Sequence, residues 1–183
     1  MKIIETKIAG LLILEPKRHM DERGFFSEVF NQEVMSSIGI ELAWVQDNHS
    51  LSTQSGVVRG LHFQTQPKAQ AKLLRVVRGA IFDVVVDLRK QSSTYGQHVS
   101  VELSADNWQQ ILVPIGCAHG FCTISTHTEV IYKVSNGYSP DHEGGLLWHD
   151  PALGIDWPIS PGDALVSPRD TLWPRFNEFN SPF

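Results

Sequence analysis

The sequence predicts an all-β fold, an antiparallel sandwich or barrel with short peripheral helices. Short strand-forming runs alternate with clusters of Gly, Pro, Asn, Ser or Asp, a spacing that is typical of such folds. No long segment repeats its apolar residues with the 3.6-residue period of a helix, which argues against β-α-β units. The chain has 183 residues, 42% of them hydrophobic, enough for one substantial core. We therefore expect one domain over residues 1–183.

The expected elements run in order from the N-terminal region. A short helix is expected over Gln32–Ile38, because Asn31 can cap its first turn and Gly39 can end it. Beyond Gly137, recurring prolines and tryptophans predict an irregular tail. The expected strands, each bounded by turn residues, are Leu11–Glu15, Phe25–Asn31, Leu42–Gln46, Val57–Phe63, Lys72–Arg78, Ala80–Leu88, Gln97–Leu103, Gln110–Val113, Gly120–Ile124 and Glu129–Ser135.

Charge and composition argue against several classes of partner. The formal net charge is -5, which disfavours a nucleic-acid binder steered by overall positive charge, so an anionic ligand would need a local basic pocket. Cys117 and Cys122 have no His or Cys cluster to complete a zinc site, and reduced thiols are expected. The apolar run from Ile8 to Leu14, broken by Gly10, is too short to cross a membrane or to act as a signal sequence. We expect a cytoplasmic protein with no nucleic-acid or membrane partner.

One stretch, Gly56–Asp87, combines apolar strands with many charged side chains. Charged groups inside apolar strands cost free energy unless each one meets a partner or a ligand. The sequence therefore predicts a cavity lined by this stretch. Its charged and ionisable residues are Arg59, His62, Lys72, Arg75, Arg78, Asp83 and Asp87.

Strand parity raises a question about this cavity. Alternate residues of a strand share a face, so Arg59 and His62 should point apart. Either Gly60 marks a bulge that re-aims one of them, or one arginine face serves a neighbouring subunit. Asp83 and Asp87 should share one face of their strand, opposite an apolar face.

His62, Lys72, His119 and Tyr132 are candidates for chemistry. Each alone is more often a packed or hydrogen-bonded core residue, but together they offer a base, a cation, a second imidazole and an acid. No nucleophile motif is present. The 8 histidines never occur as HxH, HxxxH or HExxH, so a metal site is not expected, although ligands can converge from distant strands.

Several blocks of sequence carry a family resemblance. They are DERGFF (Asp21–Phe26), VQDNHS (Val45–Ser50), VVRGLHFQ (Val57–Gln64), AQAKLLRVVRGAIFDVVVDLR (Ala69–Arg89), PIGCAHGF (Pro114–Phe121), VIYKVSNGYSPDHEGGLLWHDP (Val130–Pro151) and SPRD (Ser167–Asp170). In this order they resemble the dTDP-4-dehydrorhamnose 3,5-epimerases. The resemblance implies a cupin-like jelly roll, a homodimer with exchanged N-terminal strands, and no metal or organic cofactor. It also implies dTDP-4-dehydro-6-deoxy-D-glucose as substrate, inverted at C3 and C5 to give dTDP-4-dehydro-L-rhamnose.

The resemblance also implies roles for individual residues. His62 is similar to the general base, Asp170 to the carboxylate that orients it, and Tyr132 to the acid on the opposite face of the sugar. Lys72 and His119 resemble groups beside the sugar, where Lys72 can stabilise the enolate.

The remaining matches concern binding. Tyr138 matches an aromatic residue that stacks on thymine, Phe26 a further substrate contact, and Asp83 a partner of either His62 or His119. The matches to nucleotide- and pyrophosphate-binding positions are Arg23, Glu28, Gln46, Asp47, Asn48, Arg59, Glu143 and Arg169.

Two other kinds of function stay open at this point. A nucleotide-sugar 3,4-ketoisomerase or a single-centre epimerase could share the jelly roll and the nucleotide contacts. A non-catalytic sugar-nucleotide binding protein could keep the arginines without the chemistry. Solvent exchange into the sugar and the structure of the product sugar discriminate among them.

Overall fold

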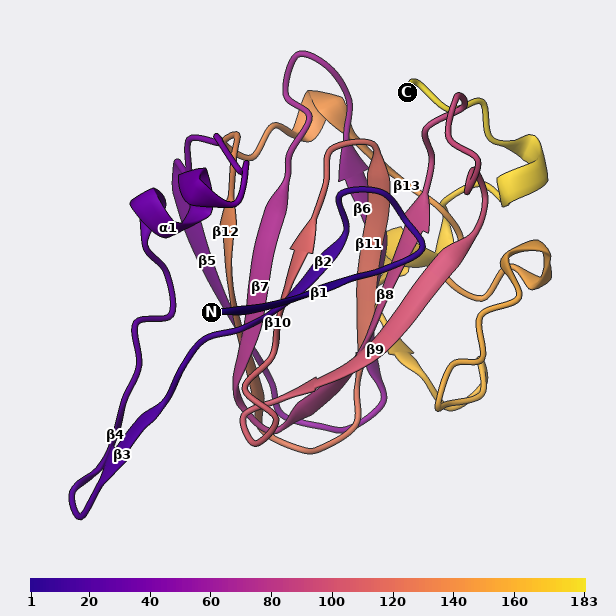
Figure 1. The fold of residues 1–183 in the computed structure, drawn as a ribbon. Helices are drawn as coiled ribbons and strands as arrows, with labels where there is room; N and C mark the ends of the chain where they lie inside the picture. Colours follow the sequence, from indigo (N-terminus) through magenta and orange to yellow (C-terminus); the bar gives the residue numbers. More distant parts are fainter.

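Two β-sheets packed face to face form the body of the protein (Figure 1). The structure, a computed structural model, describes residues 1–183. The first sheet contains, in order, β1 (Lys2–Glu5), β2 (Leu12–Glu15), β10 (Gln110–Val113), β7 (Lys72–Arg78), β12 (Thr128–Val134) and β5 (Gln46–Ser52). The second contains β13 (Glu143–Gly145), β6 (Val57–Gln64), β11 (Cys117–Thr123), β8 (Ala80–Asp87) and β9 (His98–Ser104), and β14 (Leu165–Val166) pairs with β6 in parallel. The predicted all-β sandwich is confirmed.

The N-terminal part adds a hairpin and a helix to this body. The hairpin of β3 (His19–Asp21) and β4 (Gly24–Phe26) projects away from the sheets (Figure 1), and all its strand residues are exposed. The helix α1 (Gln32–Ser37) covers the outer face of the first sheet. As predicted, the Asn31 side chain caps it, accepting hydrogen bonds from the backbone N–H groups of Glu33 and Val34. No helix has the length and apolar character needed to cross a membrane.

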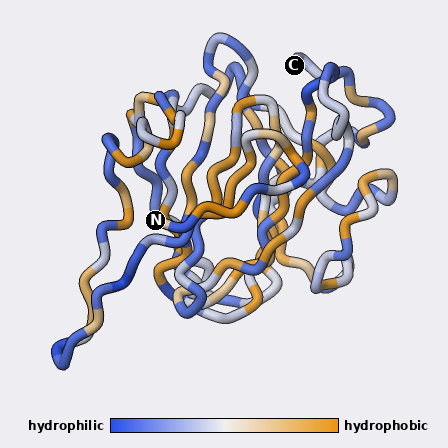
Figure 2. The backbone as a smooth tube through the Cα atoms, in the orientation of Figure 1, coloured by the Kyte–Doolittle hydropathy of each residue, from blue (hydrophilic) through white to orange (hydrophobic).

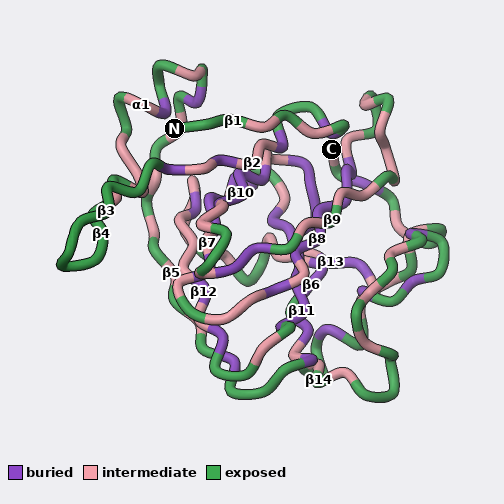
Figure 3. The backbone as a smooth tube through the Cα atoms, turned by 60° about the horizontal axis from the view of Figure 1, so that its bottom comes forward, coloured by how far each residue is buried: buried purple, intermediate pink, exposed green.

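Apart from a small cluster between α1 and the first sheet, two apolar clusters hold the layers together. One fills the space between the sheets and includes Leu74, Val85 and Phe121. A second lies on the outer face of the second sheet, where the tail beyond Gly137 packs with the fully buried Trp148. Figure 2 shows the apolar positions concentrated on the strands of the body, and Figure 3 shows buried residues along the inner strands and exposed ones along the hairpin. The tail contains the 3₁₀ turns η1 (Pro140–His142), η2 (Pro151–Leu153), η3 (Pro168–Thr171) and η4 (Phe176–Glu178).

Strand β8 follows the predicted alternation. Val84, Val86 and neighbouring apolar residues face the tail. Asp83 and Asp87 share the other face with residues of the inner cluster, and both are completely buried. The strand thus presents carboxylates to the interior of the sandwich.

Three predicted strands are wrong in their bounds. The predicted strand Gly120–Ile124 begins at Cys117 instead, as β11. Residues 42–45 are not a strand, and β5 begins at Gln46 instead. Strand β5 was missed because the residues on its inner side, which include Gln46 and Asn48, are polar. They face a hollow rather than an apolar core. The predicted strand Phe25–Asn31 ends at Phe26, because the chain leaves the hairpin there and approaches the cap of α1. Strands β1, β3, β13 and β14 were not predicted.

Candidate active site

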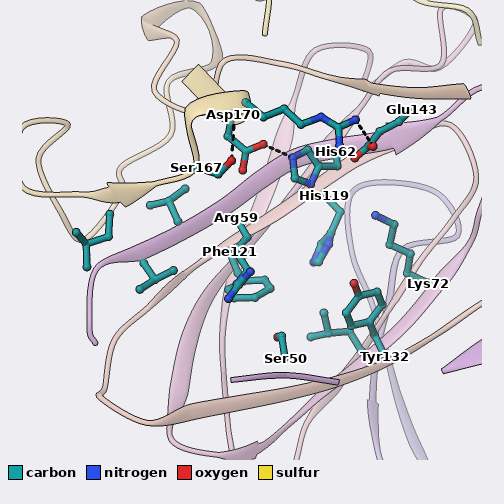
Figure 4. Close-up of a pocket in the computed structure, with 15 residues that line it drawn as sticks. Ser50, Arg59, His62, Lys72, His119, Phe121, Tyr132, Glu143, Ser167 and Asp170 are labelled. Atoms are coloured by element: carbon teal, nitrogen blue, oxygen red, sulfur yellow. Dashed lines mark hydrogen bonds and ion pairs between the residues drawn. The ribbon is translucent and has the colours of Figure 1, made fainter. Parts of the chain in front are cut away.

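A cavity of about 350 Å³ opens between the two sheets near the tail (Figure 4). Its walls come from β5, β7 and β12 of the first sheet, from β6, β11, β13 and β14 of the second, and from η3 and the residue before it. The lining residues are Ser50, Val57, Val58, Arg59, His62, Lys72, Leu74, His119, Phe121, Tyr132, Glu143, Leu165, Ser167, Arg169 and Asp170. The predicted cavity is therefore present, and it gathers polar groups from distant parts of the chain.

A second hollow of about 230 Å³ adjoins the first. The two share His62, Lys72, Tyr132 and Glu143. The second hollow also reaches residues that the sequence marked for nucleotide binding, namely Gln46, Asn48 and Tyr138. Together the hollows form an elongated site with the shared residues in its middle.

A bulge at Gly60 brings Arg59 and His62 into the same cavity. On the neighbouring strand, His119 pairs with His62 and Phe121 with Arg59, so the register shifts between them. Gly60 has φ of +123°, and a Cβ atom there would lie 2.5 Å from the Cα of Gly120. Only glycine fits this geometry. Of the two explanations for the strand parity, the bulge is confirmed.

His62 is held by a carboxylate from the tail. Its Nε2 lies 2.6 Å from Asp170 Oδ1, and Asp170 also accepts hydrogen bonds from the backbone N–H of Gly60 and from Trp173 Nε1. Burial raises the pKa of Asp170, but these hydrogen bonds outweigh it and hold the pKa below its usual range. The Ser167 hydroxyl oxygen accepts a hydrogen bond from the backbone N–H of Asp170 and so fixes the turn that carries this carboxylate. The carboxylate is thus ionised and multiply bound.

His119 forms a second histidine–aspartate pair. Its Nε2 lies 2.8 Å from Asp83 Oδ2. The Asp83 side chain is 0% exposed, and its Oδ1 has no hydrogen-bond partner. The question left by the sequence is settled here, because Asp83 contacts His119 and makes no hydrogen bond to His62.

Lys72 and Tyr132 approach from the opposite sheet, on β7 and β12 (Figure 4). Burial lowers the pKa of Lys72 to about 8, and the negative charges of Glu143 and Asp83 limit the drop. Burial also raises the pKa of Tyr132, against the opposing effect of Arg59. At neutral pH the cavity therefore contains an ammonium group and a protonated phenol across from His62.

A polar network closes the rim of the site. The Tyr138 hydroxyl donates a hydrogen bond of 2.7 Å to Glu143 Oε2, and Arg169 forms an ion pair with the same carboxylate. Arg169 Nη1 also lies 3.3 Å from the Tyr138 hydroxyl. Arg59 makes only long contacts of 3.4 Å to Ser52 Oγ and a carbonyl group, so its charge is free to meet an anionic ligand.

Four predicted site residues lie away from the cavity. Arg23 and Phe26 are exposed on the hairpin, and Glu28 follows it in the exposed linker. Asp47 points to the outer face of the first sheet, where Lys133 Nζ lies 2.9 Å from its Oδ1. Within one chain the structure does not bring these four residues to the site.

Two polar residues of the site were missed by sequence reasoning. Trp173 donates to Asp170, and Ser50 lines the cavity from β5. The polar alternation of Gln46, Asn48 and Ser50 was the available signal for the strand facing a hollow. No group of three or more His, Cys, Asp or Glu side chains is arranged to hold a metal ion.

Comparison with known proteins places the chain in a family. Residues 5–178 match the family described as dTDP-4-dehydrorhamnose 3,5-epimerase. The chain belongs to this family of isomerases. It is 53% identical over 179 residues to the dTDP-4-dehydrorhamnose 3,5-epimerase of Salmonella typhimurium, covering 97% of each chain.

Solved structures of epimerases share the fold. One from Bacillus anthracis with TDP and PPi bound has a TM-score of 0.92 and 49% identity, covering 95% of this chain and 98% of that one. One from Legionella pneumophila in complex with dTDP-4-keto-L-rhamnose has a TM-score of 0.92 and 43% identity, covering 98% and 94%. The cupin-like jelly roll expected from the resemblance is confirmed.

Proposed function

We propose that residues 1–183 act as one jelly-roll epimerase domain that inverts C3 and C5 of dTDP-4-dehydro-6-deoxy-D-glucose. The product is dTDP-4-dehydro-L-rhamnose, an intermediate of dTDP-L-rhamnose biosynthesis, and the site of action is the cytoplasm. One observation carries the proposal: in a member of this family, the His62–Asp170 pair, Lys72 and Tyr132 line one cavity from two opposing sheets.

His62 removes the proton in this mechanism. Because Nε2 is bound to Asp170, Nδ1 is the ring nitrogen left to accept a proton from the carbon beside the C4 ketone. The imidazolium that forms is stabilised by the Asp170 carboxylate, as in other histidine–carboxylate pairs. The electron pair of the broken C–H bond moves into the enolate, with its negative charge on the C4 oxygen.

The enolate requires a cation as well as a base. A general base contributes about 10²–10⁴-fold, or roughly 3–5 kcal/mol. Enzymatic acceleration begins near 10⁶-fold, about 8 kcal/mol, so the base alone is insufficient. A well-placed donor to the developing oxyanion contributes on the order of 3–4 kcal/mol. The Lys72 ammonium, which is half-buried in the cavity wall, is placed to supply this.

Tyr132 returns a proton to the other face of the sugar. Inversion requires removal on one face and delivery on the opposite one, and Tyr132 lies on the sheet opposite His62. Its raised pKa keeps the phenol protonated until the carbanion needs the proton. The tyrosinate and the imidazolium then return to their starting states by exchange with solvent, and the same cycle serves C3 and C5.

The rest of the site supports a sugar nucleotide. Arg59 offers unpaired positive charge for the pyrophosphate, and Arg169 offers guanidinium donors beside its ion pair with Glu143. The exposed ring of Tyr138 offers a surface on which thymine can stack. Gln46, Asn48 and Glu143 supply polar contacts near Tyr138.

A homodimer with exchanged N-terminal strands would complete this site. The hairpin that carries Arg23 and Phe26 extends away from its own body (Figure 1), and its exposed aromatic and charged residues suit a second copy. In this arrangement the partner supplies Arg23, Phe26 and Glu28. Asp47 lies on the outer face of the first sheet beside Lys133. If it has a role in binding, it would contact the ligand or the partner subunit on that face.

Incubation with the substrate in D₂O tests the proposed reaction. The expected result is deuterium at both C3 and C5 and an L-rhamno product by NMR. Deuterium at one carbon would instead indicate a single-centre epimerase, and a product with its keto group at C3 would indicate a ketoisomerase. Binding without any exchange would indicate a sugar-nucleotide binding protein.

A further inference from the structure

The half-buried indole of Trp173 packs against the His62–Asp170 pair from the side of the tail. Its Nε1 donates a hydrogen bond of 3.3 Å to Asp170 Oδ1, and His62 Nε2 lies 2.6 Å from the same oxygen. The rings of Trp173 and His62 meet edge to face, with their centroids 6.3 Å apart and their planes at 69°. Trp173 therefore contacts both members of the pair that the proposed reaction uses as its base.

A glycine on the neighbouring strand leaves the space for this indole. Gly145 of β13 pairs with His62 of β6, and a Cβ atom on Gly145 would lie 2.6 Å from two indole carbons of Trp173 and 2.7 Å from its Nε1. Carbon atoms in contact lie about 3.5–4.0 Å apart, so even a methyl group there would displace the ring. At the next residue, the Pro174 carbonyl accepts a hydrogen bond from the backbone N–H of Leu147. The indole is thus held on the bare backbone of β13, beside His62.

The same ring also supports an arginine of the rim. The guanidinium carbon of Arg169 lies 5.6 Å from the ring centroid of Trp173, a distance at which the ring attracts the cation. Arg169 in turn forms the ion pair with Glu143. Because Trp173 contacts both the base pair and Arg169, a substitution that tests the indole N–H has to keep an aromatic ring.

We propose that Trp173 is a positioning residue for the His62–Asp170 pair, whose indole N–H holds the Asp170 carboxylate in place and shares its Oδ1 with His62. This inference rests on the proposed epimerase reaction, in which His62 must be neutral to accept the proton. A carboxylate oxygen that accepts a second hydrogen bond attracts an imidazolium less strongly, so the indole keeps His62 neutral to lower pH. Trp173 lines neither hollow and acts through Asp170.

Other charged and titratable groups also surround the pair, and Trp173→Phe leaves all of them in place. They are Arg59 on β6, Lys72 on β7, His119 on β11 with its partner Asp83 on β8, Tyr132 on β12, Glu143 on β13 and Arg169 on η3. The remaining donor to the Asp170 carboxylate is the backbone N–H of Gly60, which binds Oδ2 and not the oxygen that His62 contacts. A change in this variant therefore reports the indole N–H.

Trp173→Phe, compared with Trp157→Phe, tests the proposal in the protein without substrate. Phenylalanine keeps a ring for Arg169 and removes the N–H. The titration of His62 is followed by NMR through a ring-proton signal, assigned by its loss in His62→Ala. Its midpoint should move up by about 0.5 pH unit, because one neutral hydrogen bond to the carboxylate is lost. Trp157 donates its N–H to the Trp148 carbonyl in the tail, so Trp157→Phe should leave the midpoint unchanged. An unmoved midpoint in Trp173→Phe, or an equal move in Trp157→Phe, would overturn the proposal.

The pH profile of turnover gives a second readout. In Trp173→Phe the acidic limb of kcat/KM should move up by about the same 0.5 pH unit. The plateau kcat should fall by about 2–10-fold with KM nearly unchanged, because the carboxylate is less firmly held. Gly145→Ala displaces the indole from Asp170, so it should move the limb in the same direction, and it tests the proposal if Trp173→Phe fails to fold. A limb at the wild-type position in both variants would overturn the proposal. Because the NMR titration involves no turnover, a moved midpoint without deuterium exchange in the wild-type protein would contradict the epimerase reaction and still support the action of Trp173 on the pair.

Discussion

Two histidine–aspartate pairs lie side by side, with both histidines on the second sheet, and their carboxylates have different surroundings. His62 and His119 are direct partners across β6 and β11. Asp170 receives donors from Gly60 and Trp173 in addition to His62, whereas Asp83 contacts a single side chain. The side chain of His62 is also more exposed, 28% against 6% for His119.

The additional donors fix the orientation of the Asp170 carboxylate and therefore of the His62 ring. His62 is also the more exposed of the two histidines, which places it better to reach a C–H bond of the substrate. We therefore assign proton abstraction to the first pair, whereas the His119–Asp83 pair lies deeper in the sheet.

Asp170→Asn should produce the largest change among the variants that probe this comparison. The amide cannot stabilise the imidazolium, and its orientation must also satisfy the donors of Gly60 and Trp173. We expect kcat to fall by about 10³–10⁴-fold, more than for Asp83→Asn, which changes the deeper pair that does not remove the proton. Steady-state kinetics on both variants measure the ratio. Equal losses would mean that the two pairs have equivalent roles.

Tyr132→Phe should have the next largest effect, and a selective one. The variant keeps both histidine pairs, so hydrogen exchange at the sugar carbons should continue while net inversion falls by about 10²-fold. Deuterium incorporation and product formation are followed in parallel by NMR. Epimerisation at the wild-type rate would show that the returning proton has another source.

Glu143→Gln should give a smaller effect that appears mainly in the pH profile. Lys72 is charged below its pKa of about 8, and Glu143 helps to keep it charged. Removing the negative charge lowers that pKa further, so the alkaline limb of kcat/KM should move down by about one pH unit. The loss appears as pH rises and is least at acidic pH. If the alkaline limb did not move, the loss of charge on Lys72 would not be what limits kcat/KM at high pH.

The sequence predicted most strands and the residues of both histidine–aspartate pairs better than it predicted which residues meet. Apolar alternation identified most strands, because packing enforces it, and it placed Asp83 on the inner face of β8. It failed for β5, whose inner residues are polar because they line a hollow.

The partners of the histidines depend on contacts that strand patterns do not encode. Asp170 lies 108 residues from His62, and only the path of the tail over the second sheet brings them together. The bulge at Gly60 was one of two alternatives, since a glycine permits such a shift without requiring it. The family resemblance predicted that Asp170 contacts His62. The structure then showed that Asp83 contacts His119 and not His62.

Position-resolved deuterium incorporation in His62→Ala and His119→Gln tests the division of roles most directly. If His62 is the base for both carbons, His62→Ala should incorporate no deuterium at C3 or C5. His119→Gln should label both carbons, in the wild-type ratio but more slowly. The account would be contradicted if each variant lost label at a different carbon, because the two histidines would then each serve as a base.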